Sequence, residues 1–404
     1  MSRRLQAQFV LTAALVAFAG TPSPSAADIG PAINPAIYKV PAGAKTINVD
    51  CDAQQTLAGA LADKSNADLN IVFSGTCKEY VYIQRDGVAI RGKDSSATVA
   101  GGIEVTAARR VLLEGFTCRD NTQLEYCIGA LLGSSVTLHN IKVFNSSIRG
   151  LSIFNSDALI DGLSVDKTIS TSILVRGSHV RIEGENNFSN TIEGCLVVDG
   201  TSSVFSKSGT FNARDCLAGV IVQSNSSFQA PYATFNLNHN TWTGLALITH
   251  GTFSYGGTMV IKNNTQSGIF VDEISSFSPF SNLLGSSTLT LENNGLVGVY
   301  ILRGSSVELA NVAANTGSKF GVLVDDGSLR ISHSQISGNK TADLYLQFGG
   351  RATFLEGVVV GTTGCDGSQN LRGPKAACTP EASTKPTVAK PSPAKPGAAK
   401  TDKD

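Results

Sequence analysis

The chain has no excess charge of either sign and almost no tryptophan. Its 404 residues include 32 basic and 32 acidic side chains, so the formal net charge is zero. A neutral chain offers no broad electrostatic surface to nucleic acid or to an anionic membrane, and we expect neither as a partner. Tryptophan occurs once, whereas glycine occurs 41 times. This composition favours a fold with many turns and few helices.

The N-terminal apolar run is too short to cross a bilayer. The run from Phe9 to Ala19 covers about half of the ~20 apolar residues that a bilayer core requires. Two arginines precede it, and small residues follow it before Asp28, which predicts a secretory signal cleaved after Ala27. We therefore expect an exported bacterial protein, periplasmic or extracellular, with no membrane span.

Cysteine motifs for metal binding are also missing. The eight cysteines include no CxxC pair and no Cys/His cluster, which disfavours a zinc site. An even number of cysteines in an exported chain indicates disulfides instead. The sequence does not fix the connectivity, and pairing sequence neighbours gives these expected bridges: Cys51–Cys77, Cys118–Cys127, Cys195–Cys216 and Cys365–Cys378.

A loose repeat runs through most of the chain. A glycine, or a residue in its place, opens a short alternating aliphatic run at Gly150, Ser172, Gly194, Gly219, Gly244, Gly268, Gly298, Gly321 and Asp343. The spacing between these marker residues is 22 to 30 residues, which is typical of a solenoid. Alternation with period 2 indicates strands. The repeat therefore predicts an all-β parallel β-helix in which each repeat forms one coil.

Asparagine recurs at a fixed place in this repeat. Four residues before the marker stand Asn190, Asp215, Asn240, Asn264, Asn294, Gly317 and Asn339. These residue types tolerate a left-handed backbone at a sharp bend between strands. Stacked from coil to coil, their side-chain amides can form a hydrogen-bonded ladder along the axis.

The segment around Thr56 resembles the first coils of a known superfamily. Thr56, Leu57, Ala60 and Leu61 place an apolar helix face where it can cap the open end of a solenoid. With the strands that follow and the asparagine ladder, this resembles the pectin-lyase-like right-handed parallel β-helix superfamily from about Asp50 to Gly361. We expect these divisions: signal peptide 1–27, N-terminal segment and capping helix 28–69, β-helix 70–362, disulfide-closed cap 363–379 and disordered Lys/Pro/Ala-rich tail 380–404.

The outer face of the marked strands is predicted to be apolar. The second and fourth residues after each marker should point outward, and they include Phe154, Leu174, Leu196, Val198, Ile221, Ile248, Phe270, Tyr300, Leu302, Leu323 and Tyr345. Phe270, Tyr300 and Tyr345 would place aromatic rings in neighbouring coils, which suits the apolar faces of sugars. The alternative is that the longer insertion near residues 273–287, or another subunit in a homo-oligomer, covers this surface.

Charged residues follow three of these strands. Asp272 and Glu273, then Arg303, then Asp325 and Asp326 come after successive strands, so stacking should place Arg303 between Glu273 and Asp326. The superfamily resemblance implies acidic residues, often with calcium, and a basic residue that removes a proton from a uronic-acid polymer. The alternative is an ion-pair ladder. The catalytic motifs of the superfamily are missing.

These observations lead to two functional hypotheses. In the first, an exported β-helix protein binds or modifies an acidic polysaccharide, as a lyase or epimerase if it is catalytic. Arg303 and the four carboxylates would form its catalytic set, with calcium as a candidate cofactor. Phe270, Tyr300, Tyr345 and His250 would bind substrate. In the second, the protein is a non-catalytic structural or interaction module of the periplasm or cell surface. The sequence leaves open whether the protein is an enzyme.

Overall fold

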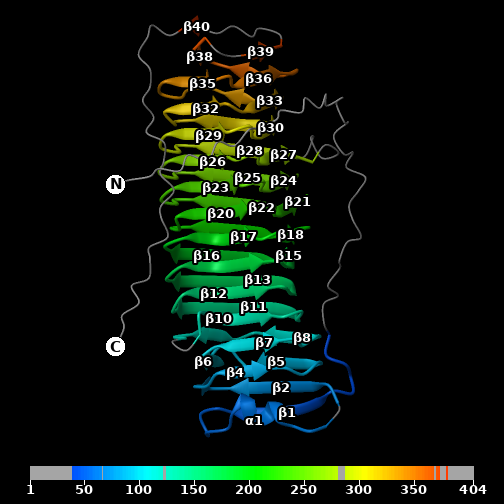
Figure 1. The fold of residues 1–404 in the computed structure, drawn as a ribbon. Coiled ribbons are helices and arrows are strands. Elements are labelled where there is room, and N and C mark those ends of the chain that lie inside the picture. The colour runs from blue at the N-terminus through cyan, green and yellow to red at the C-terminus, as the bar shows by residue number, and fades with distance from the viewer. Residues whose placement is uncertain are drawn as a thin grey trace, which may run out of the picture. The chain divides into compact units, whose positions relative to one another are not determined.

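Parallel strands stack coil on coil in the computed structural model, which describes residues 39–65, 67–121, 124–280, 287–367, 370–373 and 379–380. All the strand pairings that define the stack are parallel, for example β29 with β32 and β32 with β35. Figure 1 shows the coils from β1 at one end to β40 at the other. The fold is the right-handed parallel β-helix that the repeat and the superfamily resemblance predict.

One sheet, here called sheet B, contains the marked strands. Its fourteen strands follow one another in order along the stack. They are β4 (Val81–Ile83), β7 (Ile103–Thr106), β10 (Tyr126–Leu131), β12 (Arg149–Phe154), β14 (Thr171–Arg176), β17 (Gly194–Asp199), β20 (Ala218–Gln223), β23 (Thr243–Ile248), β26 (Ser267–Val271), β29 (Val297–Leu302), β32 (Phe320–Asp325), β35 (Ala342–Gln347), β38 (Thr363–Cys365) and β40 (Thr379–Pro380).

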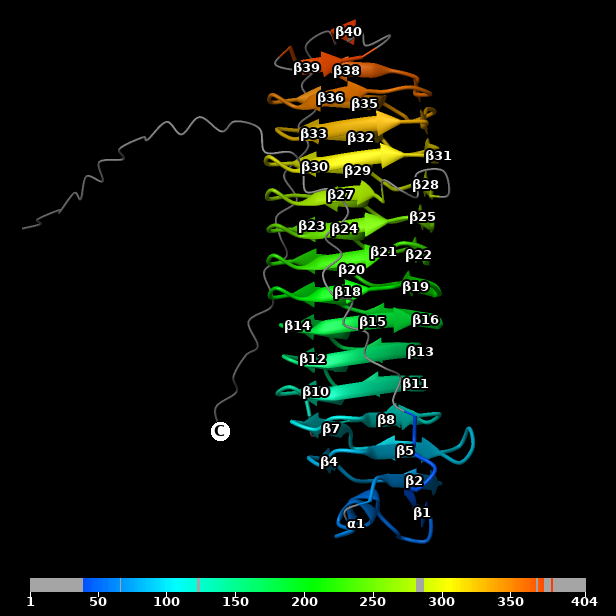
Figure 2. The same cartoon turned by 90° about the vertical axis from the view of Figure 1, so that its right-hand side faces the viewer.

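The other strands form a 24-stranded sheet, here called sheet A, and a small two-stranded sheet, β34 (Gln335–Ile336) with β37 (Val359–Val360). Figure 2 shows a row of sheet A strands, including β15 and β36, across one face. Sheet A contains β1 (Lys45–Asp50), β2 (Leu69–Ser74), β3 (Thr76–Cys77), β5 (Val88–Gly92), β6 (Thr98–Ala100), β8 (Val111–Glu114), β9 (Thr117–Arg119), β11 (Ser135–Ser146), β13 (Asp157–Thr168), β15 (His179–Glu183), β16 (Glu185–Thr191), β18 (Ser203–Phe205), β19 (Thr210–Arg214), β21 (Ser227–Ala230), β22 (Thr234–Asn238), β24 (Thr252–Tyr255), β25 (Thr258–Lys262), β27 (Ser276–Pro279), β28 (Thr288–Glu292), β30 (Ser306–Ala310), β31 (Val312–Thr316), β33 (Ser328–Ser332), β36 (Arg351–Phe354) and β39 (Asn370–Arg372).

Alternation along sheet B divides its side chains between the core and the outer face. In β29, Val299 and Ile301 are fully buried in the main core, and Tyr300 between them points outward. The same division holds in β32 for Val322 and Val324. The main hydrophobic core therefore runs along the inside of the stack, and the outward side chains lie outside it.

The predicted alignment is wrong by one residue at Gly194. Leu196 pairs with Ile173 before it and with Val220 after it, so Cys195 occupies the marker position. Leu196 and Val198 consequently point into the core, where both are fully buried. The alignment slipped because the chain between β15 and β16 holds one residue more than the matching part of β13, and because a cysteine replaces the usual glycine.

A short helix covers the N-terminal end, as the sequence predicts. Helix α1 (Leu57–Leu61) begins after Thr56, whose hydroxyl accepts a hydrogen bond from Gly59 N at 3.0 Å. Leu57 is fully buried and Ala60 is buried, so the helix lays its apolar face on the stack. The Glu79 carboxylate accepts hydrogen bonds from the first two helical N–H groups, at 2.7 and 3.0 Å.

The asparagine ladder is present, but in these coils the ladder residue and the left-handed residue are two adjacent residues. Asn240 Nδ2 donates to Asn264 Oδ1, and Asn264 Nδ2 donates to Asn294 Oδ1, both at 2.9 Å. All three side chains are buried. The left-handed residue in these coils is the one before the ladder residue, such as Asn263 with φ 56°. Of the other predicted bend residues, Asn190, Asp215 and Gly317 are themselves left-handed. The predicted set therefore merged two adjacent columns.

A serine ladder stabilises the corner after sheet B, and the sequence analysis did not find it. Backbone N–H groups donate to the serine hydroxyl of the next coil in a series from Ser134 to Ser156, Ser178, Ser202 and Ser226, at 3.1 to 3.2 Å. These serines are buried, so the hydroxyls satisfy N–H groups that lack water.

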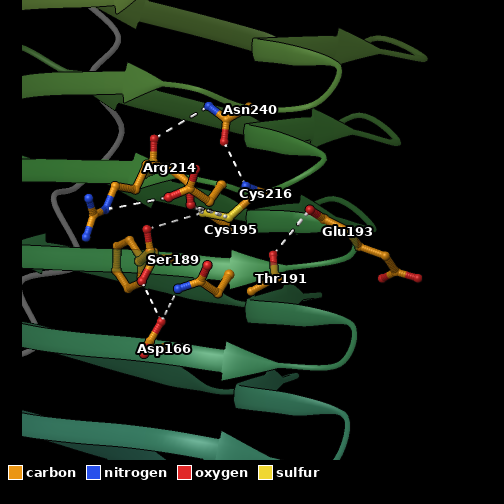
Figure 3. The surroundings of a disulfide bond; sticks show 12 residues. Asp166, Ser189, Thr191, Glu193, Cys195, Arg214, Cys216 and Asn240 are labelled. Carbon is orange, nitrogen blue, oxygen red and sulfur yellow. Dashed lines mark hydrogen bonds and ion pairs between the residues drawn. A yellow bond between two sulfur atoms is a disulfide. The ribbon is translucent and has the colours of Figure 1, made fainter. Parts of the chain in front are cut away.

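Three predicted disulfides are confirmed: Cys51–Cys77, Cys118–Cys127 and Cys195–Cys216. Cys365 is disulfide-bonded as well, and its predicted partner Cys378 lies outside the described residues. Cys216 occupies the next position of the asparagine ladder, because its backbone N–H donates to Asn240 Oδ1 at 3.2 Å (Figure 3). The covalent bridge therefore begins where the asparagine ladder ends.

Several expected segments fall outside this description. The predicted signal peptide, most of the C-terminal tail and residues 281–286 of the long insertion are not among the described residues. The extra residues of the 30-residue repeat lie between β27 and β28, both strands of sheet A. Among the described residues, no helix has the length and apolar composition needed to cross a membrane.

Candidate functional site

The predicted aromatic residues form a second hydrophobic cluster on the outer face of sheet B. Phe270, Tyr300 and Tyr345 are only 7%, 5% and 4% exposed. Phe270 contacts Trp242 at 5.2 Å and Tyr300 at 5.8 Å between ring centroids, and Tyr345 lies 5.6 Å from Phe320. Because the rings are enclosed, their faces are not open for stacking on a sugar.

Exposed apolar residues lie at the margins of this cluster. Leu296 at one corner of sheet B is 43% exposed, and Ile274 and Phe348 at the other corner are 65% and 62% exposed. They follow or precede strands that contribute to the cluster, so apolar surface extends from the enclosed rings to solvent on both sides.

The predicted charged column lies at the corner that follows sheet B. Tyr300 pairs with Phe270, and Leu302 pairs with Asp325, which places Glu273, Arg303 and Asp326 at equivalent positions. All three have a left-handed backbone, with φ of 54°, 40° and 55°. Left-handed residues recur at many corners of this stack, so the conformation belongs to the coil geometry.

The Arg303 side chain binds carboxylates of the preceding coil. Its Nε donates to Asp272 Oδ1 at 2.5 Å, and its Nη2 binds the other oxygen of the same carboxylate. Its Nη1 lies 3.0 Å from Glu273 Oε1. The arginine thus forms a fork with the carboxylates of the preceding coil, whereas the sequence predicted a position between Glu273 and Asp326.

This contact determines what Arg303 can do chemically. The hydrogen bonds from Arg303 to Asp272 raise the pKa of the guanidinium above its ordinary value, with further contributions from the charges of Asp272 and Glu273. An arginine with a raised pKa stays protonated, so it cannot remove a proton from a substrate. The Arg303 side chain is nevertheless 55% exposed, which leaves N–H groups available to a ligand.

Further polar groups surround this fork. Thr249 donates its hydroxyl to Glu273 Oε2 at 2.5 Å, and Gln347 Nε2 donates to Asp325 Oδ2 at 3.2 Å. Asp326 is exposed and Asp325 is half-buried. We call Thr249, His250, Asp272, Glu273, Arg303, Asp325 and Asp326 the Arg303 ridge.

His250 belongs to the same corner. Its backbone is left-handed, and its N–H donates to the carbonyl oxygen of Glu273 at 3.0 Å. The side chain is exposed. The structure therefore brings the predicted histidine next to the charged column, as part of the surface and outside the enclosed aromatic cluster.

Tyr300 connects the ridge with the aromatic cluster. Burial, together with the charges of Asp325 and Asp272, raises the pKa of Tyr300 to about 12. The two carboxylates come from the coils on either side of β29. The phenol therefore stays protonated under ordinary conditions and can act only as a neutral group.

The residues of the ridge do not fit a preassembled calcium site. Among the described residues, the only group of three or more histidine, cysteine and carboxylate side chains whose ligand atoms all lie within 4.8 Å of one another is Cys51, Cys77 and Glu79. The two cysteines form a disulfide and Glu79 holds α1, so this group is not a metal site. The oxygens of the ridge suit calcium chemically, but Asp272 is occupied by Arg303 and the others do not converge.

A second pair of charges lies farther toward the N-terminus on the same edge. Arg176 Nε and Nη2 bind Asp199 Oδ2 at 3.0 and 2.7 Å. Burial raises the pKa of Asp199, but hydrogen bonds from Ser224 and Arg176 outweigh it and hold the pKa below its ordinary value. Arg176 and Asp199 form an ion pair between neighbouring coils. This is the kind of contact expected if the charged columns serve as an ion-pair ladder.

A group of tyrosines that the repeat does not predict lies on the outer face of the first coils. Tyr82 points outward from β4 and is 41% exposed, and its ring stacks beside that of Tyr80 at 6.1 Å. In the next coil Glu104 pairs in register with Tyr82, and its carboxylate accepts a hydrogen bond from the Tyr126 hydroxyl at 2.7 Å. The alternating letters YVYIQ at residues 80–84 were the available signal.

Comparisons with known proteins add little beyond the architecture. No family model matches the chain, and no curated protein matches it. Among solved structures it is similar to the A-module of mannuronan C-5 epimerase AlgE4 of Azotobacter vinelandii, with 14% identity and a TM-score of 0.34 over 76% of this chain and 90% of that one. The AlgE6 A-module of the same organism gives 13% identity and a TM-score of 0.32 over 76% and 91%. At these values the likeness carries no argument about activity.

Proposed function

We propose that this parallel β-helix protein binds a polysaccharide along the outer face of sheet B, with the Arg303 ridge as the contact, and that the ridge does not catalyse a reaction. The observation that carries the proposal is the Arg303 fork. The Arg303 guanidinium is held by Asp272 and Glu273, and the Arg303 side chain is still more than half exposed. The other residues of the Arg303 ridge add hydroxyl, carboxylate and imidazole groups that can hydrogen-bond sugar hydroxyls.

The charges of the ridge favour a hydroxyl-rich polymer over a strongly acidic one. One guanidinium stands among the four carboxylates of Asp272, Glu273, Asp325 and Asp326. An acidic polymer would meet this surplus of negative charge, and the ridge offers it no assembled cation site. The sequence suggested an acidic polysaccharide and lyase or epimerase chemistry. The experiment below therefore includes acidic polymers and an assay for their cleavage.

The test compares binding of sodium alginate, pectate, a soluble glucan and a soluble galactomannan by calorimetry. We expect binding of at least one neutral polymer and no release of unsaturated sugars from the two acidic ones. Arg303→Ala alone would leave the buried Asp272 carboxylate unpaired, at a cost to folding of about 3–5 kcal/mol. The informative variant is therefore Arg303→Gln combined with Asp272→Asn, which removes both charges.

We expect this paired variant to weaken polymer binding about tenfold while keeping the fold. The matched control is Arg214→Ala, because Arg214 is 69% exposed on sheet A, away from the ridge. The proposal fails if none of the four polymers binds, or if the paired variant and the control bind alike. Production of unsaturated sugars by the wild-type protein would instead establish catalysis.

An interaction module is the second candidate, and a different observation favours it. The enclosed cluster around Phe270, Tyr300 and Tyr345 continues into exposed Leu296, Ile274 and Phe348, which is unusual for a surface that faces only water. If this face joins two copies, the protein should sediment as a dimer, and Phe348→Asp should convert it to a monomer. A monomeric wild-type protein would exclude this form of the hypothesis.

A further inference from the structure

We propose that the outer face of sheet B carries a second polysaccharide contact at its N-terminal end, formed by the exposed ring of Tyr82 with Gln84 and Glu104. In this arrangement one polymer chain lies along sheet B from Tyr82 to the Arg303 ridge. The inference rests on the proposed function, because it extends the same binding face.

Tyr82 offers an aromatic ring that is open to solvent. Tyr82 stands between Val81 and Ile83, which are fully buried, so its side chain projects from the sheet. It is 41% exposed, whereas Phe270 and Tyr300 on the same face are 7% and 5% exposed. A sugar presents apolar C–H faces to an open ring, so Tyr82 offers the stacking surface that the predicted residues do not.

The Tyr82 ring is also held in place by its neighbours. Its plane lies at 26° to that of Tyr80, and the ring centroids are 6.1 Å apart. Its hydroxyl accepts a hydrogen bond from Gln84 Nε2 at 2.5 Å. A ring supported on one side and tethered at its tip loses little further freedom when a ligand binds to it.

Polar groups that can hydrogen-bond a sugar lie beside the ring. Glu104 follows Tyr82 in the same outward column, and its carboxylate accepts hydrogen bonds from the Thr106 hydroxyl at 2.9 Å and the Tyr126 hydroxyl at 2.7 Å. The Tyr80 side chain also hydrogen-bonds Glu104, so most of the roughly four acceptor positions of the carboxylate are used and about one remains for a sugar hydroxyl. Burial and Glu104 raise the pKa of Tyr126, which keeps its hydroxyl protonated as a donor.

Gly129 completes the site by its lack of a side chain. It follows Glu104 in the same column, and a Cβ at this position would collide with the ring of Tyr126. Glycine therefore allows the Tyr126 ring to lie over the column and reach Glu104. Gly129 thus leaves room for the Tyr126 ring, and the Tyr126 hydroxyl donates the hydrogen bond that orients the Glu104 carboxylate.

The two contacts are separated along the sheet by nine coil steps, from β4 to β29. At ~4.8 Å per step this is about 43 Å. A long polymer can touch both contacts, and a trisaccharide can touch only one. Linked contacts raise the overall affinity well above that of either alone, by about 10²-fold or more.

The experiment titrates the wild-type protein and its variants with the four polymers named above and with trisaccharides prepared from them. We expect Tyr82→Ala to weaken polymer binding about tenfold and Tyr82→Phe to weaken it much less, because the phenylalanine keeps the ring and loses only the hydrogen bond from Gln84. Tyr82→Leu keeps apolar bulk without an aromatic face and should behave like the alanine variant if the fold is intact. Tyr232→Ala is the control, because Tyr232 is 57% exposed outside the strands of sheet B.

The possible outcomes separate the two proposals. If Tyr82→Ala and Tyr82→Leu bind polymer as the wild type does, while the paired Arg303 and Asp272 variant loses binding, the second contact is wrong and the proposed function stands. If trisaccharides bind as tightly as polymers, the extended arrangement is wrong. If the wild type binds no polymer, the proposed function fails and this inference fails with it.

Discussion

At the scale of single residues, Asp343 shows how a charged side chain can close a coil. It stands at a marker position where most other coils have glycine, and it is 3% exposed. Its carboxylate accepts hydrogen bonds from Asn339 N and Nδ2, both at 2.9 Å, and from Thr362 N at 2.7 Å and Oγ1 at 3.1 Å. Burial raises the pKa of Asp343, but these bonds outweigh burial and hold the pKa below its ordinary value.

Replacement of Asp343 should therefore have an effect that depends on pH. Asp343→Ala leaves four donors without an acceptor, and we expect a loss of about 2 kcal/mol in the free energy of unfolding at neutral pH. Because the folded pKa is depressed, the carboxylate stabilises the fold above its unfolded pKa of about 3.9, and this contribution is lost as the pH falls. Denaturant unfolding at neutral pH and near pH 3 checks both statements, and an equal loss at both pH values would contradict them.

Tyr300 supplies a second test at this scale. Its pKa of about 12 exceeds the ordinary value of about 10, so the folded state holds this proton longer than the unfolded state does. The resulting stabilisation is fully present below about pH 10 and is lost as the pH rises through about 12. Alkaline absorbance titration of wild type minus Tyr300→Phe should show one phenol that ionises in this late range. A difference curve centred at the ordinary pKa would show that Tyr300 is open to solvent.

At the scale of strands and corners, the two internal ladders explain which features the sequence reveals. The inward aliphatics repeat every second residue, so the strands of sheet B could be predicted. The alignment slipped at Gly194 because the marker can be any small residue, here Cys195, and corners vary in length. The serines of the second ladder, such as Ser178 and Ser202, look like ordinary turn residues in the sequence, and only stacking shows their bonds to the next coil.

The asparagine ladder should be sensitive to a break in its middle. Asn264→Ala removes the acceptor of Asn240 Nδ2 and the donor to Asn294 Oδ1 inside the core, and we expect a loss of about 2 kcal/mol in unfolding free energy. Asn236 is the matched control, because it forms a similar amide contact with Asn212 at 2.7 Å but is only half-buried on the outer face of sheet A. Asn236→Ala should cost less than about 0.5 kcal/mol. Equal losses in denaturant unfolding would mean that burial does not set the strength of the ladder.

At the scale of the whole stack, the sequence predicts which residues share a column but not how their side chains meet. It placed Arg303 level with Glu273 and Asp326, and the register agrees. It did not predict the fork with Asp272, because side-chain reach along the corner is independent of the repeat. It also left Tyr82 out, because the alignment began at Gly150 and the earlier coils lack the same marker. Enclosure of Phe270 and Tyr300 depends on what packs over them, which periodicity does not encode.

The disulfides divide the stack unevenly. Tyr82 lies in the sequence between Cys77 and Cys118, whose bridges Cys51–Cys77 and Cys118–Cys127 stabilise the first coils. No cysteine occurs between Cys216 and Cys365, the stretch that contains Arg303. A thiol reductant should therefore loosen the coils around Tyr82 before those around Arg303, which limited proteolysis in dithiothreitol would detect as earlier cleavage in the first coils than between Cys216 and Cys365. In a reducing compartment the protein would keep its contact at Arg303 and lose the one at Tyr82. It would then hold its ligand at one site and no longer along the length of the stack.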